Sequence, residues 1–330
     1  MFRGLVLSAL LTLGGYALSR IPLLHQSGFS PLVFALLLGI VVGNIPGIKA
    51  IPSAQRGLQF CTRWLLRGGI VLFGLSLTLQ QIMKLGPSVM ALDVGVITIV
   101  MVVGYFIGTR VLNLDKDITL LTCAGSAICG AAAVLATEAA IRSRPAATAM
   151  AVATVVLFGT LAMLMYPLLY PLTGLGEHIF GIYIGATIHE VAQVVAAGDA
   201  VGPDALANAV IVKLVRVMLL VPFLLIIGQW WTVRHAAHDS QIKQKIIIPW
   251  FAFGFLAVVV FNSFVVLPEI VHSSFVLAGQ IGLTMAMAAL GYETRLDKLK
   301  ALGIKPFVLA LSLFVMLMGG GLLTVHIWIA

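Results

Sequence analysis

Long apolar runs, separated by short polar gaps, make up most of this 330-residue chain. An α-helix needs about 20 predominantly apolar residues to cross a lipid bilayer. Runs suited to a crossing, the second of them short, lie at roughly 4–20, 31–44, 65–82, 88–110, 146–170, 205–231, 246–268, 274–293 and 305–328. We therefore predict an all-α polytopic membrane protein with about nine full crossings. Residues 1–330 are expected to form a single transmembrane domain.

Two further segments, 119–140 and 179–198, differ from these runs in composition. Both are rich in Gly, Ala and small polar residues, and both are weakly hydrophobic for helices that face lipid. Length alone does not say whether such segments cross the membrane. Their placement follows from the charges on either side of them.

The charged residues in the polar gaps predict an orientation. Five gaps are basic and contain Arg56, Arg63 and Arg67; Arg110 and Lys116; Arg142 and Arg144; Arg234, Lys243 and Lys245; and Arg295, Lys298, Lys300 and Lys305. Gaps 171–180 and 199–204 have no Lys or Arg, only Glu177, Asp199 and Asp204. Because cytoplasmic loops are enriched in Lys and Arg, we predict basic gaps in the cytoplasm and acidic gaps in the periplasm. A bacterial inner-membrane protein with a cytoplasmic N-terminus and a periplasmic C-terminus follows.

This orientation requires both atypical segments to return to the side from which they enter. Segment 119–140 begins and ends at basic gaps, whereas segment 179–198 begins and ends at acidic gaps. We predict that each is a discontinuous, re-entrant helical segment with non-helical backbone at its turn. Such backbone is tolerated within a membrane only where protein or a water-filled cavity surrounds it. Two facing segments of this kind therefore indicate a cavity.

The same two segments are related in sequence. A shift of 60 residues aligns GSAICGAAAVLA at 125–136 with GATIHEVAQVVA at 185–196, and about ten of 33 aligned positions are identical. One crossing, 146–170, separates the copies, so they point in opposite directions through the membrane. Inverted repeats built on broken helices are typical of secondary transporters, which bind substrate where the breaks meet. We predict an inverted-repeat transporter fold with halves centred on 119–170 and 179–231.

Two basic residues, Lys213 and Arg216, lie near the middle of the predicted span 205–231. A charge at the centre of such a helix costs about 2.5–3.5 kcal/mol, and the spacing of three residues places both side chains on one face. That face is expected to look into a polar interior, where the two cations would bind an anionic substrate. The alternative is a structural ion pair with Glu190 or Glu138.

The second atypical segment carries the titratable pair His189 and Glu190 after its predicted turn. Ionisable groups at membrane depth usually have a function, and we predict that this pair couples transport to protons. A fixed salt bridge from Glu190 to Arg216 is the alternative. Gln193, one turn beyond Glu190, is predicted to add a hydrogen bond to the substrate.

The first atypical segment offers Ser126, Cys129 and Gly130 at its predicted turn. Glycine lets the backbone approach a ligand closely, and a helix that restarts after a break presents free N–H groups to an anion. We predict that these residues line the substrate site; close helix packing by small residues is the alternative. For the single polar residues Asp93 and Asn262, a structural role is the simpler interpretation.

Composition and motifs exclude several other classes of protein. The chain is 61% hydrophobic and 10% charged, against about a quarter charged in globular domains. Its net charge of +8 does not indicate nucleic-acid binding, because the basic residues occupy short gaps and no exposed face. Cys61, Cys123 and Cys129 lack the spacing of disulfide or zinc sites. HEVAQ lacks the second His of a zinc protease, and no GxxxxGK[ST] occurs. We therefore expect no enzyme activity, metal or cofactor.

Several runs of the sequence carry a family resemblance. They are LLRGGIVLFGLSLT (65–78), GSAICGAAAVLATE (125–138), IYIGATIHEVAQVVAAG (182–198), KLVRVMLLVPFL (213–224) and AMAALG (286–291). They closely resemble the YeiH family of bacterial inner-membrane proteins, which is described as a family of sulfate exporters. The family is distantly similar to bile-acid/sodium symporters and sodium–proton antiporters. The resemblance implies inverted repeats, crossed discontinuous helices and a mobile core domain that slides against a scaffold.

Together these observations predict a secondary active transporter that exports a small anion, such as sulfate or a related oxyanion, with proton coupling. The expected partners are the anion and the lipid bilayer, and a second copy of the chain, in a homodimer, is a further candidate. The alternatives are a sodium- or proton-coupled carrier of another small solute and an anion channel. A membrane sensor or assembly scaffold would show no flux at all.

Overall fold

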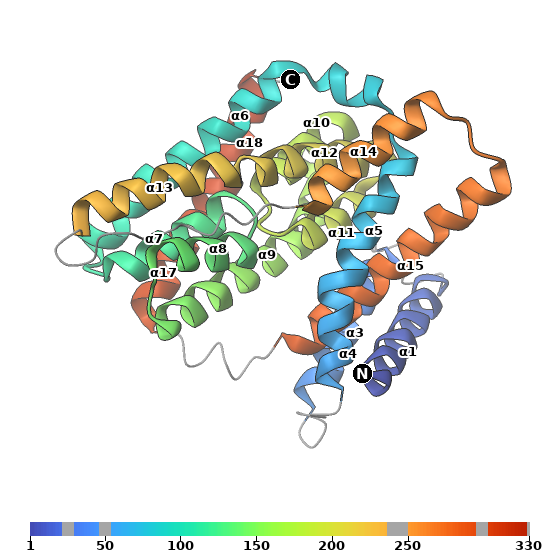
Figure 1. Cartoon of the computed structure of the whole chain (residues 1–330), viewed down its shortest axis with the longest axis horizontal. Coiled ribbons are helices and arrows are strands. Elements are labelled where there is room, and N and C mark those ends of the chain that lie inside the picture. The colour runs from blue at the N-terminus through green and yellow to red at the C-terminus, as the bar shows by residue number, and fades with distance from the viewer. Residues whose placement is uncertain (22–29, 46–53, 236–249, 295–302, 329–330) are drawn as a thin grey trace. The chain divides into compact units, whose positions relative to one another are not determined.

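The computed structural model of the chain describes residues 1–21, 30–45, 54–235, 250–294 and 303–328. Every regular element in these ranges is a helix, as the sequence predicts (Figure 1). Some of the residues that the sequence places in basic gaps lie outside the described ranges, namely Lys243, Lys245, Arg295, Lys298 and Lys300.

Among the described residues, 6 helices are long and apolar enough to cross a membrane. They are Phe2–Ser19, Leu85–Val111, Pro145–Thr173, Pro203–Trp231, Glu269–Glu293 and Ile304–Ile327, and each corresponds to a predicted crossing. Two shorter helices, Pro31–Asn44 and Trp250–Phe264, lie within the predicted crossings 31–44 and 246–268. The predicted crossing 65–82 is divided between several helices. The protein is therefore an α-helical membrane protein, and the number of its crossings stays a prediction.

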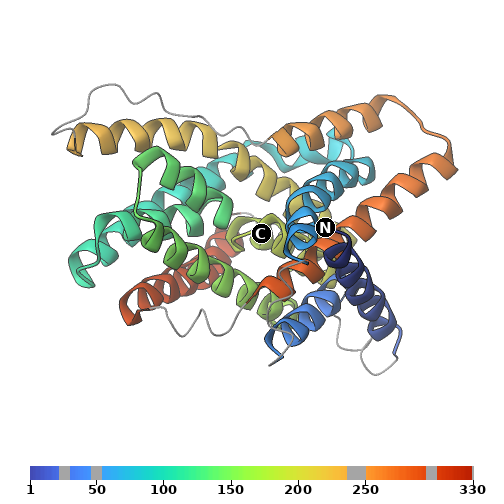
Figure 2. The same cartoon turned by 60° about the horizontal axis from the view of Figure 1, so that its bottom comes forward.

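The helices form two compact units, and the first unit combines the start of the chain, residues 195–203 and a later stretch. It contains α1 (Phe2–Ser19), α3 (Pro31–Asn44), α4 (Gln55–Phe60), the π-helix η1 (Cys61–Leu65), α5 (Leu66–Phe73), the 3-10 helix η2 (Gly74–Ser76), α14 (Trp250–Phe264) and α15 (Glu269–Glu293). Helix α15 packs against α1 and α3 (Figures 1 and 2). A Cβ on Gly291 would collide with the Leu36 carbonyl oxygen, so glycine permits this close approach.

The basic gap that holds Arg56, Arg63 and Arg67 is helical, since helical backbone runs without interruption over 55–76. The physical reason is that only one face of this helix has to be apolar. Leu58 is buried on that face, so the helical pattern continues past the arginines on the other side. The placement of this gap on the cytoplasmic side stays a prediction.

The predicted run 65–82 is divided by a break in the helical backbone. Helical backbone stops before Leu77, and α6 (Leu79–Phe106) begins two residues later. The side-chain amide of Asn262 donates hydrogen bonds to the carbonyl oxygens of Leu75 and Leu77, at 2.8 and 3.0 Å. Backbone carbonyls at such a break need donors, so Asn262 has a structural role here.

The second unit contains the first atypical segment and residues 179–194 of the second. It comprises α6 from Pro87 onwards, η3 (Ile107–Val111, a π-helix), α7 (Lys116–Ala127), α8 (Ala131–Ile141), α9 (Pro145–Thr173), α10 (Glu177–Thr187), the first residues of α11 (Val191–Val201), α12 (Pro203–Met218), α13 (Leu220–His235), α17 (Ile304–Val315), η4 (Met316–Gly320, a π-helix) and α18 (Gly321–Trp328).

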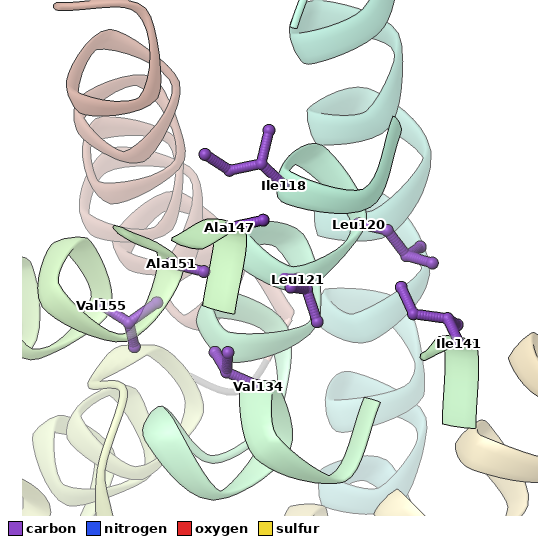
Figure 3. Close-up of a cluster of buried hydrophobic side chains, with 8 residues drawn as sticks. All are labelled: Ile118, Leu120, Leu121, Val134, Ile141, Ala147, Ala151 and Val155. Carbon is purple, nitrogen blue, oxygen red and sulfur yellow. The ribbon is translucent and has the colours of Figure 1, made fainter. Parts of the chain in front are cut away.

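Helices α7 and α8 form a hairpin with Gly130 at its turn. Gly130 has φ 69°, a conformation that glycine adopts without strain. At the open end, the Ser143 hydroxyl donates a hydrogen bond to Asp117 at 3.2 Å, so the start of α7 lies beside the end of α8. Buried side chains of both helices, among them Leu121 and Val134, pack with side chains of α9 (Figure 3).

The second atypical segment has the same layout. A shift of 60 residues carries α8 onto α11 residue for residue, and carries the first break, 128–130, onto the second, 188–190. A Cβ on Gly181 would contact the backbone of Ala205, so α12 lies close against α10 at this point. Both segments are thus discontinuous, as predicted, whereas their inverted orientation in a membrane stays a prediction.

Arg144 closes the open end of the first hairpin. Its guanidinium group bonds both carboxylate oxygens of Asp117 at 3.0 Å and lies 2.5 Å from Asp115. The Arg144 and Asp115 side chains are 64% and 68% exposed. Exposed ion pairs of this kind contribute little to stability, so this cluster fixes geometry more than it stabilises the fold.

Candidate functional site

A single side chain, Lys213 of α12, joins the two helix breaks. Its ammonium group donates hydrogen bonds to the carbonyl oxygens of Ile128 and Ile188, each at 2.6 Å. These carbonyls occupy equivalent positions at the C-terminal ends of α7 and α10, where peptide dipoles place partial negative charge. Lys213 is completely buried. The two bonds explain how the fold accommodates this cation.

Arg216 lies one turn further along α12 and is equally buried. Its Nε and Nη2 atoms donate to Oδ1 of Asp93 in α6, at 2.9 and 2.7 Å, and neither side chain is exposed. Nη2 also donates to the carbonyl oxygen of Ala186, near the end of α10. Among the described residues, Oδ2 of Asp93 and Nη1 of Arg216 have no hydrogen-bond partner. The pair therefore keeps unused bonding capacity on both sides.

This contact corrects the predicted ion-pair partner. The sequence offers Glu190 or Glu138 as the carboxylate for Arg216, whereas the structure has Asp93. A signal was present, because Asp93 lies inside the apolar run 88–110, whose other charged residue, Arg110, is its last. Ionisable residues within membrane helices usually pair with one another, so two buried cations call for such an acid.

The carboxylate of Glu190 lies over the first break. Its Oε1 accepts a hydrogen bond from the backbone N–H of Ala131, the first residue of α8, at 3.2 Å. A Cβ on Gly130 would collide with Cγ of Glu190, so the turn needs glycine for space as well as for its positive φ. Negative charge is favourable at a helix N-terminus. Glu190 thus occupies the kind of place that the sequence predicts for a substrate anion.

Gln193 and His189 lie at the second break, His189 within it and Gln193 in the first turn of α11. Oε1 of Gln193 accepts from the backbone N–H of Glu190 at 3.1 Å, in the manner of a capping box. Nε2 of Gln193 donates to the Thr160 hydroxyl at 3.3 Å. His189 is 1% exposed, and its Nδ1 has no hydrogen-bond partner in the part of the chain that the structure describes. Gln193 therefore orders the start of α11, and its predicted substrate contact stays a prediction.

Ser126 and Cys129 are buried on either side of the end of α7. The Ser126 hydroxyl has no hydrogen-bond partner within the described ranges, and Cys129 lies within electrostatic range of Lys213 and Glu190. All eight predicted site residues therefore lie at the two breaks or on the helix face that joins them. Their roles in binding and coupling stay predictions.

The fixed charges at the breaks balance. Lys213 and Arg216 supply two positive charges, and Asp93 and Glu190 supply two negative charges when ionised. Unpaired charge is costly in a buried, low-dielectric environment. An additional ion can therefore bind here favourably only if it displaces a partner, or if a carboxylate takes up a proton.

The described part of the chain is helical, has six helices suited to crossing a membrane and gathers buried charges at two helix breaks, which are features of a polytopic membrane protein. Its sequence matches the family described as "Conserved hypothetical protein 698" over residues 3–310. It is 46% identical to "UPF0324 inner membrane protein YeiH" of Escherichia coli K12 over 322 residues, which cover 96% of this chain and 91% of that protein. The chain belongs to this family of UPF0324 membrane proteins.

Other relatives have similar extents. "UPF0324 inner membrane protein YeiH" of Salmonella typhimurium is 45% identical over 329 residues, covering 98% of this chain and 93% of that protein. A "UPF0324 membrane protein" of Bacteroides thetaiotaomicron is 42% identical over 327 residues, covering 97% and 96%. No solved structure matches the chain. The predicted resemblance to the YeiH family is confirmed.

Proposed function

We propose that this protein is a secondary active transporter that exports a small anion, sulfate or a related oxyanion, across the bacterial inner membrane with proton coupling. The observation that carries the proposal is the attachment of Lys213 to both helix breaks. Secondary transporters place substrate and coupling ions where interrupted helices meet. In this proposal the protein is a carrier, performs no enzymatic reaction and needs no cofactor.

Matching helix boundaries and opposite charges support an inverted repeat. Each half has an interrupted segment followed by a long helical stretch, in register at a shift of 60 residues. The open end of the first hairpin carries Arg142 and Arg144, whereas the open end of the second carries Glu177 and Asp204. By the positive-inside rule the first hairpin enters from the cytoplasm and the second from the periplasm. The two breaks would then meet near the midplane of the bilayer.

The choice of an anion rests on the groups at the breaks. Two buried cations and the N-terminal ends of α8 and α11 all favour negative charge. The Glu190 carboxylate, bonded to the N-terminus of α8, is itself an anion in such a place. We assign substrate binding to Ser126, Cys129, Gly130, Gln193, Lys213 and Arg216, and proton coupling to His189 and Glu190.

A second candidate, a sodium- or proton-coupled carrier of another small solute, is favoured by a specific observation. Lys213 already bonds two carbonyl oxygens and Arg216 already bonds Asp93. In this version both cations only neutralise helix ends and acidic side chains, and the solute need not be anionic. An anion channel would use the same residues without any coupling to a gradient.

Reconstitution in liposomes tests these alternatives. Labelled sulfate flux would be measured with and without a pH gradient for the wild type and for Arg216→Gln. Loss of one charged hydrogen-bond donor costs about 1.5–3 kcal/mol, so we expect at least a tenfold loss of sulfate binding and flux. Arg110→Gln, at an exposed arginine of the same unit, is the matched control and should transport normally.

The outcomes separate the candidates. Sulfate binding that survives Arg216→Gln, together with altered cation dependence, would favour the second carrier. Sulfate flux that ignores the pH gradient would indicate a channel. No flux for any anion or other small solute would refute the transporter proposal.

A further inference from the structure

We propose that Asp93 is an internal counterion that competes with the substrate anion for Arg216, so that a proton binds to Asp93 each time an anion binds. This inference rests on the proposed function and adds a coupling residue to it. It also removes a conflict, since Arg216 cannot bind a substrate anion strongly while a buried carboxylate neutralises it.

The geometry of the pair favours exchange over a purely structural role. Both donors of Arg216 converge on one oxygen, Oδ1 of Asp93, instead of forming the parallel two-oxygen fork that binds a carboxylate most firmly. Oδ2 of Asp93 and Nη1 of Arg216 are buried and have no described partner. Oδ2 is thus available to a proton, and Nη1 is available to an oxyanion oxygen.

Arg216 keeps its position without Asp93. Nη2 is also held by the carbonyl oxygen of Ala186 at the end of α10. Lys213, one turn away, is fixed by its two carbonyl bonds. When Asp93 becomes neutral, both cations therefore stay where they are. The breaks then carry an excess of positive charge that an anion can neutralise.

The charged groups that face Asp93 in the described residues are few. Arg216 and Lys213, both on α12, interact with it electrostatically. Arg216 in turn interacts with Cys129, Tyr166 and His189. None of these three is a carboxylate, and the other buried carboxylate of the site, Glu190, interacts with Lys213. Proton uptake at Asp93 is therefore the most direct way to free Arg216.

The exchange fixes a charge balance. A proton from solution binds Oδ2 of Asp93, the neutral carboxyl group releases Nε and Nη2 of Arg216, and an oxyanion takes these donors together with Nη1. Sulfate carries two negative charges, so one sulfate with one proton moves a net charge of minus one. Sulfate flux should therefore respond to the membrane potential as well as to the pH gradient.

Calorimetry on the full-length protein in detergent tests the inference. Sodium sulfate would be titrated at one pH into buffers of different ionisation enthalpy, which gives the number of protons taken up per sulfate bound. We expect about one proton for the wild type. Because binding is linked to the uptake of one proton, sulfate affinity should fall about tenfold per pH unit at pH values above the pKa of Asp93 in the sulfate-free protein.

Variants assign the proton to a residue. Asp93→Asn should bind sulfate with an uptake of about zero protons and with little pH dependence. Asp93→Glu keeps a carboxylate at this position and should leave the count near one. Glu190→Gln tests the rival carboxylate: loss of the proton in this variant, with a count near one in Asp93→Asn, would assign the proton to Glu190 instead. Asp115→Asn is the matched control, because Asp115 makes an exposed ion pair with Arg144.

Several results would overturn the inference. These are a wild-type count of zero, a count near one in Asp93→Asn, and a folded Asp93→Asn protein that no longer binds sulfate. If Asp93→Asn cannot be purified, a wild-type count of zero still overturns the inference, and loss of the proton in Glu190→Gln overturns it by assigning the proton to Glu190. Absence of binding for every anion in the wild type would overturn the proposed function as well, whereas binding without proton uptake overturns this inference but not the proposed anion binding.

Discussion

The two helix breaks share a backbone plan but differ in chemistry. Each separates helices that match at a shift of 60 residues, and each presents an isoleucine carbonyl to Lys213. The first break ends in Gly130, whereas the second places Glu190 at the equivalent position. The Glu190 side chain then fills the space that Gly130 leaves open. The repeat thus supplies the same framework twice, while one copy supplies room and the other supplies charge.

Replacing the group that both breaks share should have the largest effect. Lys213→Met keeps the apolar stem but leaves the carbonyl oxygens of Ile128 and Ile188 without their donor. Charge-assisted hydrogen bonds contribute about 1.5–3 kcal/mol each, so we expect a loss of about 3 kcal/mol or more in the free energy of unfolding and no sulfate flux. Thermal unfolding in detergent measures the first effect.

Lys116→Met is the matched control for that variant, because Lys116 is exposed at the start of α7. It should unfold at the wild-type temperature. Should Lys213→Met unfold at that temperature as well, the shared attachment would have no role in holding the breaks together.

An intermediate effect is expected where the two breaks meet. Gly130→Ala imposes a positive φ on alanine and a collision with the side chain of Glu190. We expect a loss of about 1–3 kcal/mol in the free energy of unfolding. In a Glu190→Ala background the collision disappears and only the backbone cost remains. The same substitution should therefore cost less there, as a double-mutant cycle would measure.

Gly176→Ala provides the control for the Gly130 variant. Gly176 precedes α10 with φ −71°, and a Cβ there meets no atom within 4 Å. Equal costs for Gly130→Ala with and without the Glu190 side chain would mean that the two breaks do not interact.

The smallest effect should distinguish the open ends of the two hairpins. Arg144 joins the first by an exposed ion pair, whereas Asn208 of α12 meets His178 of α10 at 3.0 Å across the second. We expect Arg144→Gln to lower the free energy of unfolding by less than about 1 kcal/mol, and this loss should become smaller as salt screens the ion pair. Asn208→Ala should have a cost that salt leaves unchanged. Unfolding at low and high salt checks this, and equal salt dependence would contradict it.

The long helices and the breaks were accessible from the sequence because lipid and charge constrain them strongly. An apolar run of about 20 residues has few alternatives to a membrane helix, and the helix over 145–173 matches its predicted run closely. The small residues around Gly130 and the charges at both ends of each atypical segment predicted the interruptions. Those signals are local, so a single sequence is enough to carry them.

Contacts between distant parts of the chain were not accessible in the same way. Asp93 and Arg216 are 123 residues apart, and nothing near either residue says which carboxylate meets which cation. The helical backbone through Arg56, Arg63 and Arg67 was missed because these arginines interrupt the apolar run in the order of residues. Charge in a gap and charge on the free side of a helix look alike when only the order of residues is known.

Because Lys213 holds both carbonyl oxygens at once, α7, α10 and α12 are tied at a single point. A gate that opened by drawing the two hairpin tips apart would have to break a bond to a buried ammonium group. Movement of the three helices as one rigid body leaves both bonds intact. In the proposed transporter, the route from one side of the membrane to the other is therefore expected to change around this body and not through it.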